Sequence, residues 1–343
     1  MSASSAGAGT EFRDDRRAAS ARRLPAAVLQ RLTRLDDRRS AAAVLLTLAT
    51  IVGLLAAAVA IDRGWAYALA VPLIATQQHA LFVLAHDAAH YRLFSNRSLN
   101  DRVGRALGSI AGISMCTYRV IHRLHHNHLY AELDPDVALN GGYPRGRAYL
   151  LRKLATDLSG LTAVKTYAYF FGSPSRNDQT DQALRPLDDT SPALRAAALA
   201  DRNGVIAVQL ALPVIVAVAG GWSALALYLL LWVLPAVTVL QAILRLRAVF
   251  EHGAPDDLAS PLRSARTNVV GLLGRWLMFP HHVNYHIEHH LYPAVPHYRL
   301  PALHAALREH GLLDGADVCG WRGTWRRVYA DRRDAAPDRS GGR

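Results

Sequence analysis

Cysteine is scarce in this chain, and recognisable nucleic-acid motifs are missing. The 343 residues include only Cys116 and Cys319, too few for a disulfide framework or a thiolate metal site. The net charge is +12 and the pI is about 10.1, but no nucleic-acid-binding motif accompanies that charge. A signal peptide is also missing from the first forty residues, which are polar and rich in Arg, Ala and Ser. We therefore expect no nucleic-acid partner, a disordered basic tail over residues 1–40, and a second disordered tail over residues 331–343.

What the chain has in quantity is apolar sequence. Hydrophobic residues make up 51% of it beside 19% charged residues, which suggests membrane spans separated by polar segments. A helix needs about 20 apolar residues to cross a hydrocarbon core of roughly 30 Å. The segments that meet or approach this length are 41–61, 65–85, 204–220 and 222–244. Short connections predict two hairpins, with kinks at Pro213 and Pro235 in the second.

Positive charge is concentrated at one end of these spans. The arginines concerned are Arg38, Arg39, Arg92, Arg97, Arg102, Arg105, Arg195, Arg202, Arg245 and Arg247. Because cytoplasmic loops of membrane proteins are rich in Lys and Arg, this end should face the cytoplasm, together with both termini. We predict an integral protein of a bacterial inner membrane. Its fold class should be all-α, with four transmembrane helices (domain 41–330) capped by a cytosolic helical domain.

Three short histidine clusters, called boxes below, fall on the predicted cytoplasmic side. They contain eight of the sixteen histidines: His86, His90, His122, His125, His126, His286, His289 and His290. Spacings of i, i+3 and i, i+4 place imidazoles on one face of a helix. One zinc ion uses about four ligands, so eight imidazoles predict a site for two metal ions. Ligand type alone leaves iron, copper, nickel and zinc open.

Carboxylates and further histidines lie beside the boxes. The second nitrogen of a metal-binding imidazole usually donates to a carboxylate or carbonyl. Candidate outer partners of the box histidines are Asp87, Asp134, Asp136, Glu288, His281 and His282. A ligand role stays open for both His281 and His282, and His282 lies four residues before His286. We expect no catalytic residue beyond the metal ligands.

The stretches HDAAH, HRLHHNHLYAELDPD and NYHIEHHLYPAVPHYRLPALH, in this order across roughly residues 41–312, resemble the membrane fatty-acid desaturase and hydroxylase superfamily. The likeness is to its acyl-lipid or sphingolipid desaturase branch. It implies a non-haem centre of two iron ions, dioxygen as co-substrate, and the box histidines as ligands. His252, between the last span and the third box, occupies the place of a further ligand. The chain lacks the HPGG motif of a fused haem domain, so its two electrons should come from a separate ferredoxin-like protein and its reductase.

The predicted reaction is desaturation of a fatty-acyl chain held in a membrane lipid. Hydroxylation or ketone formation on a lipid, alkane or carotenoid would use the same site and stays open. A membrane zinc hydrolase is a more distant alternative, because HDAAH resembles HExxH with Asp for Glu. Metal transport is another. The arginines around 92–105 and 322–327 either contact lipid headgroups or dock an acidic electron donor.

Overall fold

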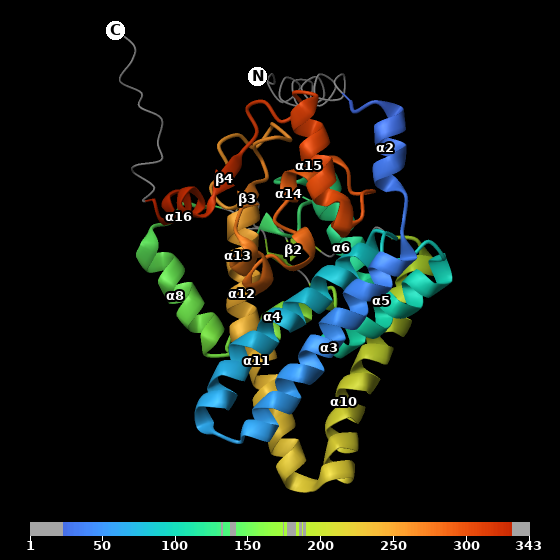
Figure 1. The fold of residues 1–343 in the computed structure, drawn as a ribbon, viewed down its shortest axis with the longest axis vertical. Helices are drawn as coiled ribbons and strands as arrows, with labels where there is room; N and C mark the ends of the chain where they lie inside the picture. The colour runs from blue at the N-terminus through green and yellow to red at the C-terminus, as the bar shows by residue number, and fades with distance from the viewer. Residues whose placement is uncertain are drawn as a thin grey trace, which may run out of the picture.

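The computed structural model describes residues 23–330, except 132, 138–141, 174, 177–182, 185–186 and 188–189. The chain is mostly helical, as predicted (Figure 1). The helices are α2 (Ala26–Thr33), α3 (Asp37–Ile61), α4 (Gly64–Ala89), α5 (Arg97–Ala111), α6 (Met115–His128), α8 (Arg147–Leu158), α9 (Ala163–Phe170), α10 (Pro192–Tyr228), the π-helical η1 (Leu229–Val233), α11 (Leu234–Val237), α12 (Val239–His252), α13 (Leu272–Leu277), the 3₁₀-helical η2 (Pro280–His282), α14 (His286–Leu291), the 3₁₀-helical η3 (His297–Arg299), α15 (Leu300–Glu309) and α16 (Trp321–Tyr329). Four short strands accompany them: β1 (Ser175–Arg176) pairs antiparallel with β2 (Ala183–Leu184), and β3 (Thr267–Val269) pairs parallel with β4 (Val318–Gly320).

Three apolar stretches of helix among the described residues are long enough to cross a membrane. They are Asp37–Ile61, Gly64–Ala89 and the continuous stretch Pro192–His252. The third changes direction at Gly221, whose φ of +71° is left-handed and suits glycine. In Figure 1 the lower end of α10 turns back at the bottom of the molecule, and the chain then rises through η1 as α11 and α12. The glycine pair therefore forms the predicted hairpin turn.

The two prolines of this hairpin behave differently. α10 continues through Pro213, whereas regular helix is lost around Pro235. The π-helical η1 precedes Pro235, and Thr238 has non-helical angles of −120° and −85°. Proline lacks the N–H that would bond to the preceding turn, which accounts for the interruption.

Helix α4 lies at the centre of the bundle. Every residue from Ile74 to Ala89 on it is buried. Its apolar side chains pack against α3, α5 and α12 in one core cluster that includes Val44, Leu84 and Ile243. The last turn of α4 carries the first histidine box. His86 therefore lies on a stretch of helix that is buried within the protein.

The prediction of a disordered tail over residues 1–40 is wrong for residues 23–40. These residues form α2 and the start of α3, which Asp36 caps by accepting hydrogen bonds from the backbone N–H groups of Arg38 and Arg39. Leu24 and Leu32 are buried in the core cluster that contains Leu303 and Leu307. The segment is polar in composition but presents an apolar stripe to α15, and this packing orders it. Residues 1–22 and 331–343, where the two disordered tails were otherwise expected, lie outside the described residues.

Candidate metal centre

The histidine boxes are on helices, as their spacing predicted. His86 lies in the last turn of α4 and His90 is its C-cap residue. The second box lies on α6 and the third on the short helix α14. His252, the last residue of α12, lies at the same end of the bundle. The structure brings these four segments together, so that nine imidazoles converge in two neighbouring groups.

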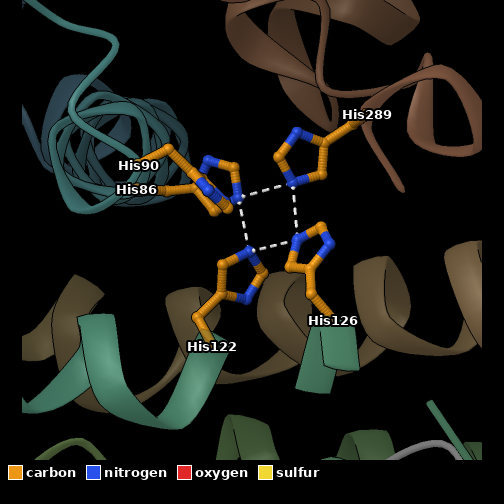
Figure 2. A group of neighbouring side chains, drawn as sticks. All are labelled: His86, His90, His122, His126 and His289. Carbon is orange, nitrogen blue, oxygen red and sulfur yellow. Dashed lines mark hydrogen bonds between the residues drawn. The ribbon is translucent and has the colours of Figure 1, made fainter. Parts of the chain in front are cut away.

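The first group contains five histidines, His86, His90, His122, His126 and His289, and is called the five-histidine group (Figure 2). Four of their Nε2 atoms form a closed ring. The distances from His86 are 2.9 Å to His122 and 3.1 Å to His289, and those from His126 are 2.9 Å and 3.0 Å to the same two residues. The fifth Nε2, that of His90, is buried and has no hydrogen-bond partner among the described residues. Such spacings are those of adjacent ligands that each lie about 2.1 Å from one ion.

The second group contains His125, His252, His286 and His290 and is called the four-histidine group. The Nε2 atom of His252 lies 3.2 Å from that of His125 and 2.7 Å from that of His286, which is 3.1 Å from that of His290. All nine predicted ligands therefore fall into one group or the other. Both groups fit a metal ion, because several buried nitrogen atoms face one another and cannot all hold a proton.

Burial keeps most of these imidazoles neutral, which is the form that binds metal. It lowers the pKa of His122, His126, His286, His289 and His290, and that of His90 falls to about 3. His125 differs. Burial lowers its pKa too, but Asp134 and Asp136 outweigh that effect and raise it to about 9. Its Nδ1–H donates to Asp134 at 2.9 Å, which leaves Nε2 directed at the four-histidine group.

Three of the four carboxylates predicted beside the boxes do lie against box imidazoles. Asp134 and Asp136 approach Nδ1 of His125 at 2.9 and 3.4 Å, and Asp87 lies 3.5 Å from Nδ1 of His86. The prediction for Glu288 is wrong. Its carboxylate accepts hydrogen bonds from Thr267 and from His304 on α15. At 100° per residue, the side chain of Glu288 leaves α14 on the face opposite that of His286.

His281 and His282 belong to neither metal group. His281 lies 3.2 Å from the hydroxyl of Thr47, and its ring packs against that of His297. His297 donates its Nδ1–H to Asp87 at 2.7 Å, so His281 connects to the five-histidine group only through two intermediates. The ring of His282 packs against Tyr285 instead. Burial lowers the pKa of His281 to about 3 and that of His282 to about 4.

Sequence reasoning missed two partners of imidazoles in the four-histidine group, a carboxylate and a backbone carbonyl. Glu251 lies 3.6 Å from Nδ1 of His286, and the carbonyl of Ser264 lies 3.4 Å from Nδ1 of His252. Arg247, interpreted as a charge flanking a span, is instead partly buried and paired with Glu251 at 2.9 Å. The position of Glu251 immediately before His252 was a sequence signal for a carboxylate near the metal centre. The backbone carbonyl of Ser264 has no such signal, because every residue has a backbone carbonyl.

Aromatic side chains pack against the five-histidine group, and an apolar cavity lies farther along α4. Tyr118 stacks on His122 with ring centroids 5.1 Å apart, Phe170 packs edge-on against Tyr118, and Phe82 packs against Phe170. A cavity of about 300 Å³ lies between α4, α5, α9 and the second hairpin. Among its lining residues are Gln78, Gly112, Tyr167, Gln209 and Trp232. Gln78 precedes His86 by eight residues, about 12 Å along the axis of α4.

Comparison with known proteins identifies the family of this chain. The family model described as "Fatty acid desaturase" matches residues 63–317. The chain is 28% identical to a dihydrorhizobitoxine desaturase of Bradyrhizobium elkanii (69% of this chain, 66% of that protein). It is 27% identical to an omega-3 fatty acid desaturase of the endoplasmic reticulum of Vigna radiata var. radiata (76% and 70%), and 26% identical to a beta-carotene ketolase of Paracoccus sp. strain N81106 (65% and 72%). It thus spans about two thirds of the length of these relatives. The resemblance read from the three boxes is confirmed, and the chain belongs to the fatty acid desaturase family of oxidoreductases.

Proposed function

We propose that this protein is a membrane-bound, dioxygen-dependent desaturase that introduces a C=C bond into the acyl chain of a lipid. The observation that carries the proposal is the convergence of nine imidazoles into two neighbouring groups, with an apolar cavity farther along α4. The family match supports the reaction class. A separate ferredoxin-like protein with its reductase supplies the two electrons; one relative is named as a ferredoxin-type acyl-lipid desaturase.

The ligand assignment follows the two groups. The five-histidine group and the four-histidine group each hold one iron ion, with the nine imidazoles as ligands. When bound, the iron pair supplies the activation of dioxygen and the oxidising power that removes two hydrogens from adjacent carbons. The protein itself keeps the imidazoles neutral and buried, and it orients their Nε2 atoms toward the metal positions. Asp134 orients His125 in this way, because its carboxylate accepts a hydrogen bond from Nδ1–H and so leaves Nε2 free to bind metal.

The substrate is an alkyl chain rather than a polar molecule. The cavity beside Gln78 is lined by apolar side chains such as Ile110, Val205 and Trp232. It lies about 12 Å along α4 from the first box, so a chain that occupied it could place a more distant methylene at the metal centre. The packed rings of Tyr118 and Phe170 add apolar surface next to His122 of the five-histidine group.

The chain crosses the membrane four times, as two hairpins, in a bacterial inner membrane. Both termini and the metal centre are on the cytoplasmic side, below a helical cap. Exposed apolar side chains along the hairpins support this arrangement, because water would not favour them: Leu46 is 70% exposed on α3, and Leu210 and Val214 are 67% and 61% exposed on α10. The arginines gathered at the ends of these helices that lie on the same side as the histidine boxes support the orientation.

Oxygen insertion is the second candidate reaction, because beta-carotene ketolases are among the relatives. It needs the same site and differs only in whether the substrate loses a second hydrogen or gains oxygen. A zinc hydrolase is disfavoured. Asp87, which would have to act as its base, accepts two hydrogen bonds from His297 and does not point into an open site.

The proposal is tested by expressing the chain with a compatible ferredoxin and reductase and analysing membrane lipids under ¹⁸O₂. We expect acyl chains that are 2 Da lighter and carry no label. His289→Ala should abolish the product, whereas His310→Ala, an exposed histidine outside both groups, should not. Label retained in the product would replace desaturation by oxygen insertion. The same product from His289→Ala would contradict the metal assignment.

A further inference from the structure

The two histidine groups differ in the acidic groups that surround them. Both contain four Nε2 atoms at close spacing, linked by contacts of 2.7–3.2 Å. Carboxylates that contact the outer nitrogens of metal-binding imidazoles raise the electron density of the ligand and the affinity for metal. An unequal distribution of such carboxylates therefore has consequences for the ions.

The five-histidine group has one carboxylate within 4.0 Å of its ring nitrogens, among the residues described. This is Asp87, which lies 3.5 Å from Nδ1 of His86. The same carboxylate also accepts hydrogen bonds from the backbone N–H of His297, at 3.0 Å, and from its Nδ1–H, at 2.7 Å. Asp87 is thus bound more closely by a histidine outside the group than by the one within it.

The four-histidine group has three carboxylates in such contact. Asp134 and Asp136 both approach Nδ1 of His125, and Glu251 approaches Nδ1 of His286 at 3.6 Å. One positive charge offsets them, because Arg247 pairs with Glu251 at 2.9 Å. The formal charge of these partners is −2, against −1 beside the five-histidine group. Asp134 and Glu251 are buried, whereas the side chain of Asp136 is 23% exposed, so solvent screens the charge of Asp136 in part but not that of the other two.

We propose that the two metal positions are inequivalent, and that the four-histidine group binds the first ion and holds it more tightly. The proposal rests on the two-metal centre of the proposed function and adds an order of loading to it. The feature that favours the other group is its fifth imidazole, His90. The Nε2 atom of His90 lies outside the ring of close contacts and would add a neutral ligand to the five-histidine group. The carboxylates beside the four-histidine group instead add negative charge, which stabilises a cation directly.

Asparagine at position 134 or 87 provides a matched pair of tests. Each substitution removes one buried charge and keeps an oxygen that can accept the Nδ1–H of a neighbouring imidazole. The purified full chain in lipid nanodiscs would be freed of metal with a chelator and titrated anaerobically with ⁵⁷Fe²⁺. Free iron gives the affinities, and Mössbauer spectra at one and at two equivalents show whether the two positions differ.

We expect two-phase binding, with different spectra for the first and second equivalents. Asp134→Asn should weaken the tighter phase by about 10- to 100-fold, and Asp87→Asn should weaken only the second phase. Asp134 also accepts hydrogen bonds from the backbone at Tyr130 and Asp136, so this variant could disturb the loop. Glu251→Gln, on a different helix, tests the same group independently and should also weaken the tighter phase.

The outcomes separate the inference from the function on which it rests. A tighter phase that is weakened by Asp87→Asn and unchanged in both Asp134→Asn and Glu251→Gln would overturn the order of loading. Two identical irons with one affinity would overturn the inequivalence and leave the two-metal centre intact. Failure of the wild-type chain to bind two equivalents would instead overturn the proposed function.

Discussion

Arg266 offers the sharpest test of how the cap holds the metal centre. Its side chain is 1% exposed and lies under the C-terminal end of α12, the helix that ends at His252. The guanidinium donates to the carbonyls of Phe250, Gly253 and Ala254 at 3.1–3.3 Å, and to the carboxylate of Asp317 at 2.9 Å. These carbonyls have no partner within the helix, so Arg266 caps it and fixes the position of His252.

Replacement by methionine keeps the apolar stem and removes all four hydrogen bonds. The carbonyls of Gly253 and Ala254 lose this donor, at about 1 kcal/mol each, whereas that of Phe250 still accepts from the Asn268 amide at 3.1 Å. Breaking a buried ion pair costs about 3–5 kcal/mol, but Asp317 keeps Arg327 at 2.9 Å, which reduces that contribution. We therefore expect Arg266→Met to lower the free energy of unfolding by about 3–5 kcal/mol. Denaturant unfolding in mild detergent, followed by tryptophan fluorescence, measures this loss.

The matched control is Arg266→Lys, which retains the charge beside Asp317 but has a single donor group. It cannot reach three carbonyls and a carboxylate together, so its loss should lie between those of wild type and Arg266→Met. A loss below about 1 kcal/mol for the methionine variant would refute the reasoning, since no value that small fits four buried hydrogen bonds.

The deficit should also depend on pH. Burial raises the pKa of the Asp317 carboxyl, and Arg266 and Arg327 partly counter that rise. Without Arg266 the folded-state pKa rises further above its unfolded value of about 3.9. A carboxyl of this kind favours the folded state most when it is protonated, and that advantage is lost as the pH rises through the folded-state pKa. The loss of stability in Arg266→Met should therefore be smaller at pH 5 than at pH 8, and an equal loss at both would contradict this explanation.

Two further substitutions test the packing around the boxes. Gly104→Ala would place a Cβ 2.4 Å from that of Ala88, between the two histidines of the first box, and should cost about 1–3 kcal/mol and reduce iron retention; Gly53→Ala, with no atom within 4 Å of the new Cβ, is its control. Asp201→Ala removes the acceptor of two buried hydrogen bonds at the start of α6 and should cost about 1–3 kcal/mol by thermal unfolding, while Asp201→Asn should recover part of that loss. Equal stability of Gly104→Ala and Gly53→Ala, or of Asp201→Ala and wild type, would contradict these contacts.

The features that sequence predicted are those with a local cause. Helical spacing predicted that each box lies on one helix. The apolar runs and the glycine pair 220–221 predicted the hairpins. The division of the boxes between two groups has no local cause. His122 and His126 join one group while His125 joins the other, and the third box is split in the same way. That division depends on the angles at which α4, α6, α12 and α14 meet.

The errors have similar origins. α2 was missed because its apolar stripe is short and acquires meaning only against α15. Glu288 was placed beside the metal because it lies within a box, although the rotation of α14 directs it to Thr267 and His304. Glu251 was missed because its partner His286 is 35 residues away in sequence. Contacts between distant segments are set by packing, which composition and periodicity do not encode directly.

The central claim is that two groups of histidines hold two iron ions. Metal content by mass spectrometry of the purified chain, expressed with ample iron, tests it most directly. The account predicts about two irons per chain, with no more than one retained in the four-histidine variant His286→Ala or in the five-histidine variant His289→Ala, and full retention in His310→Ala. One zinc per chain, or two irons unaffected by both ligand substitutions, would contradict it.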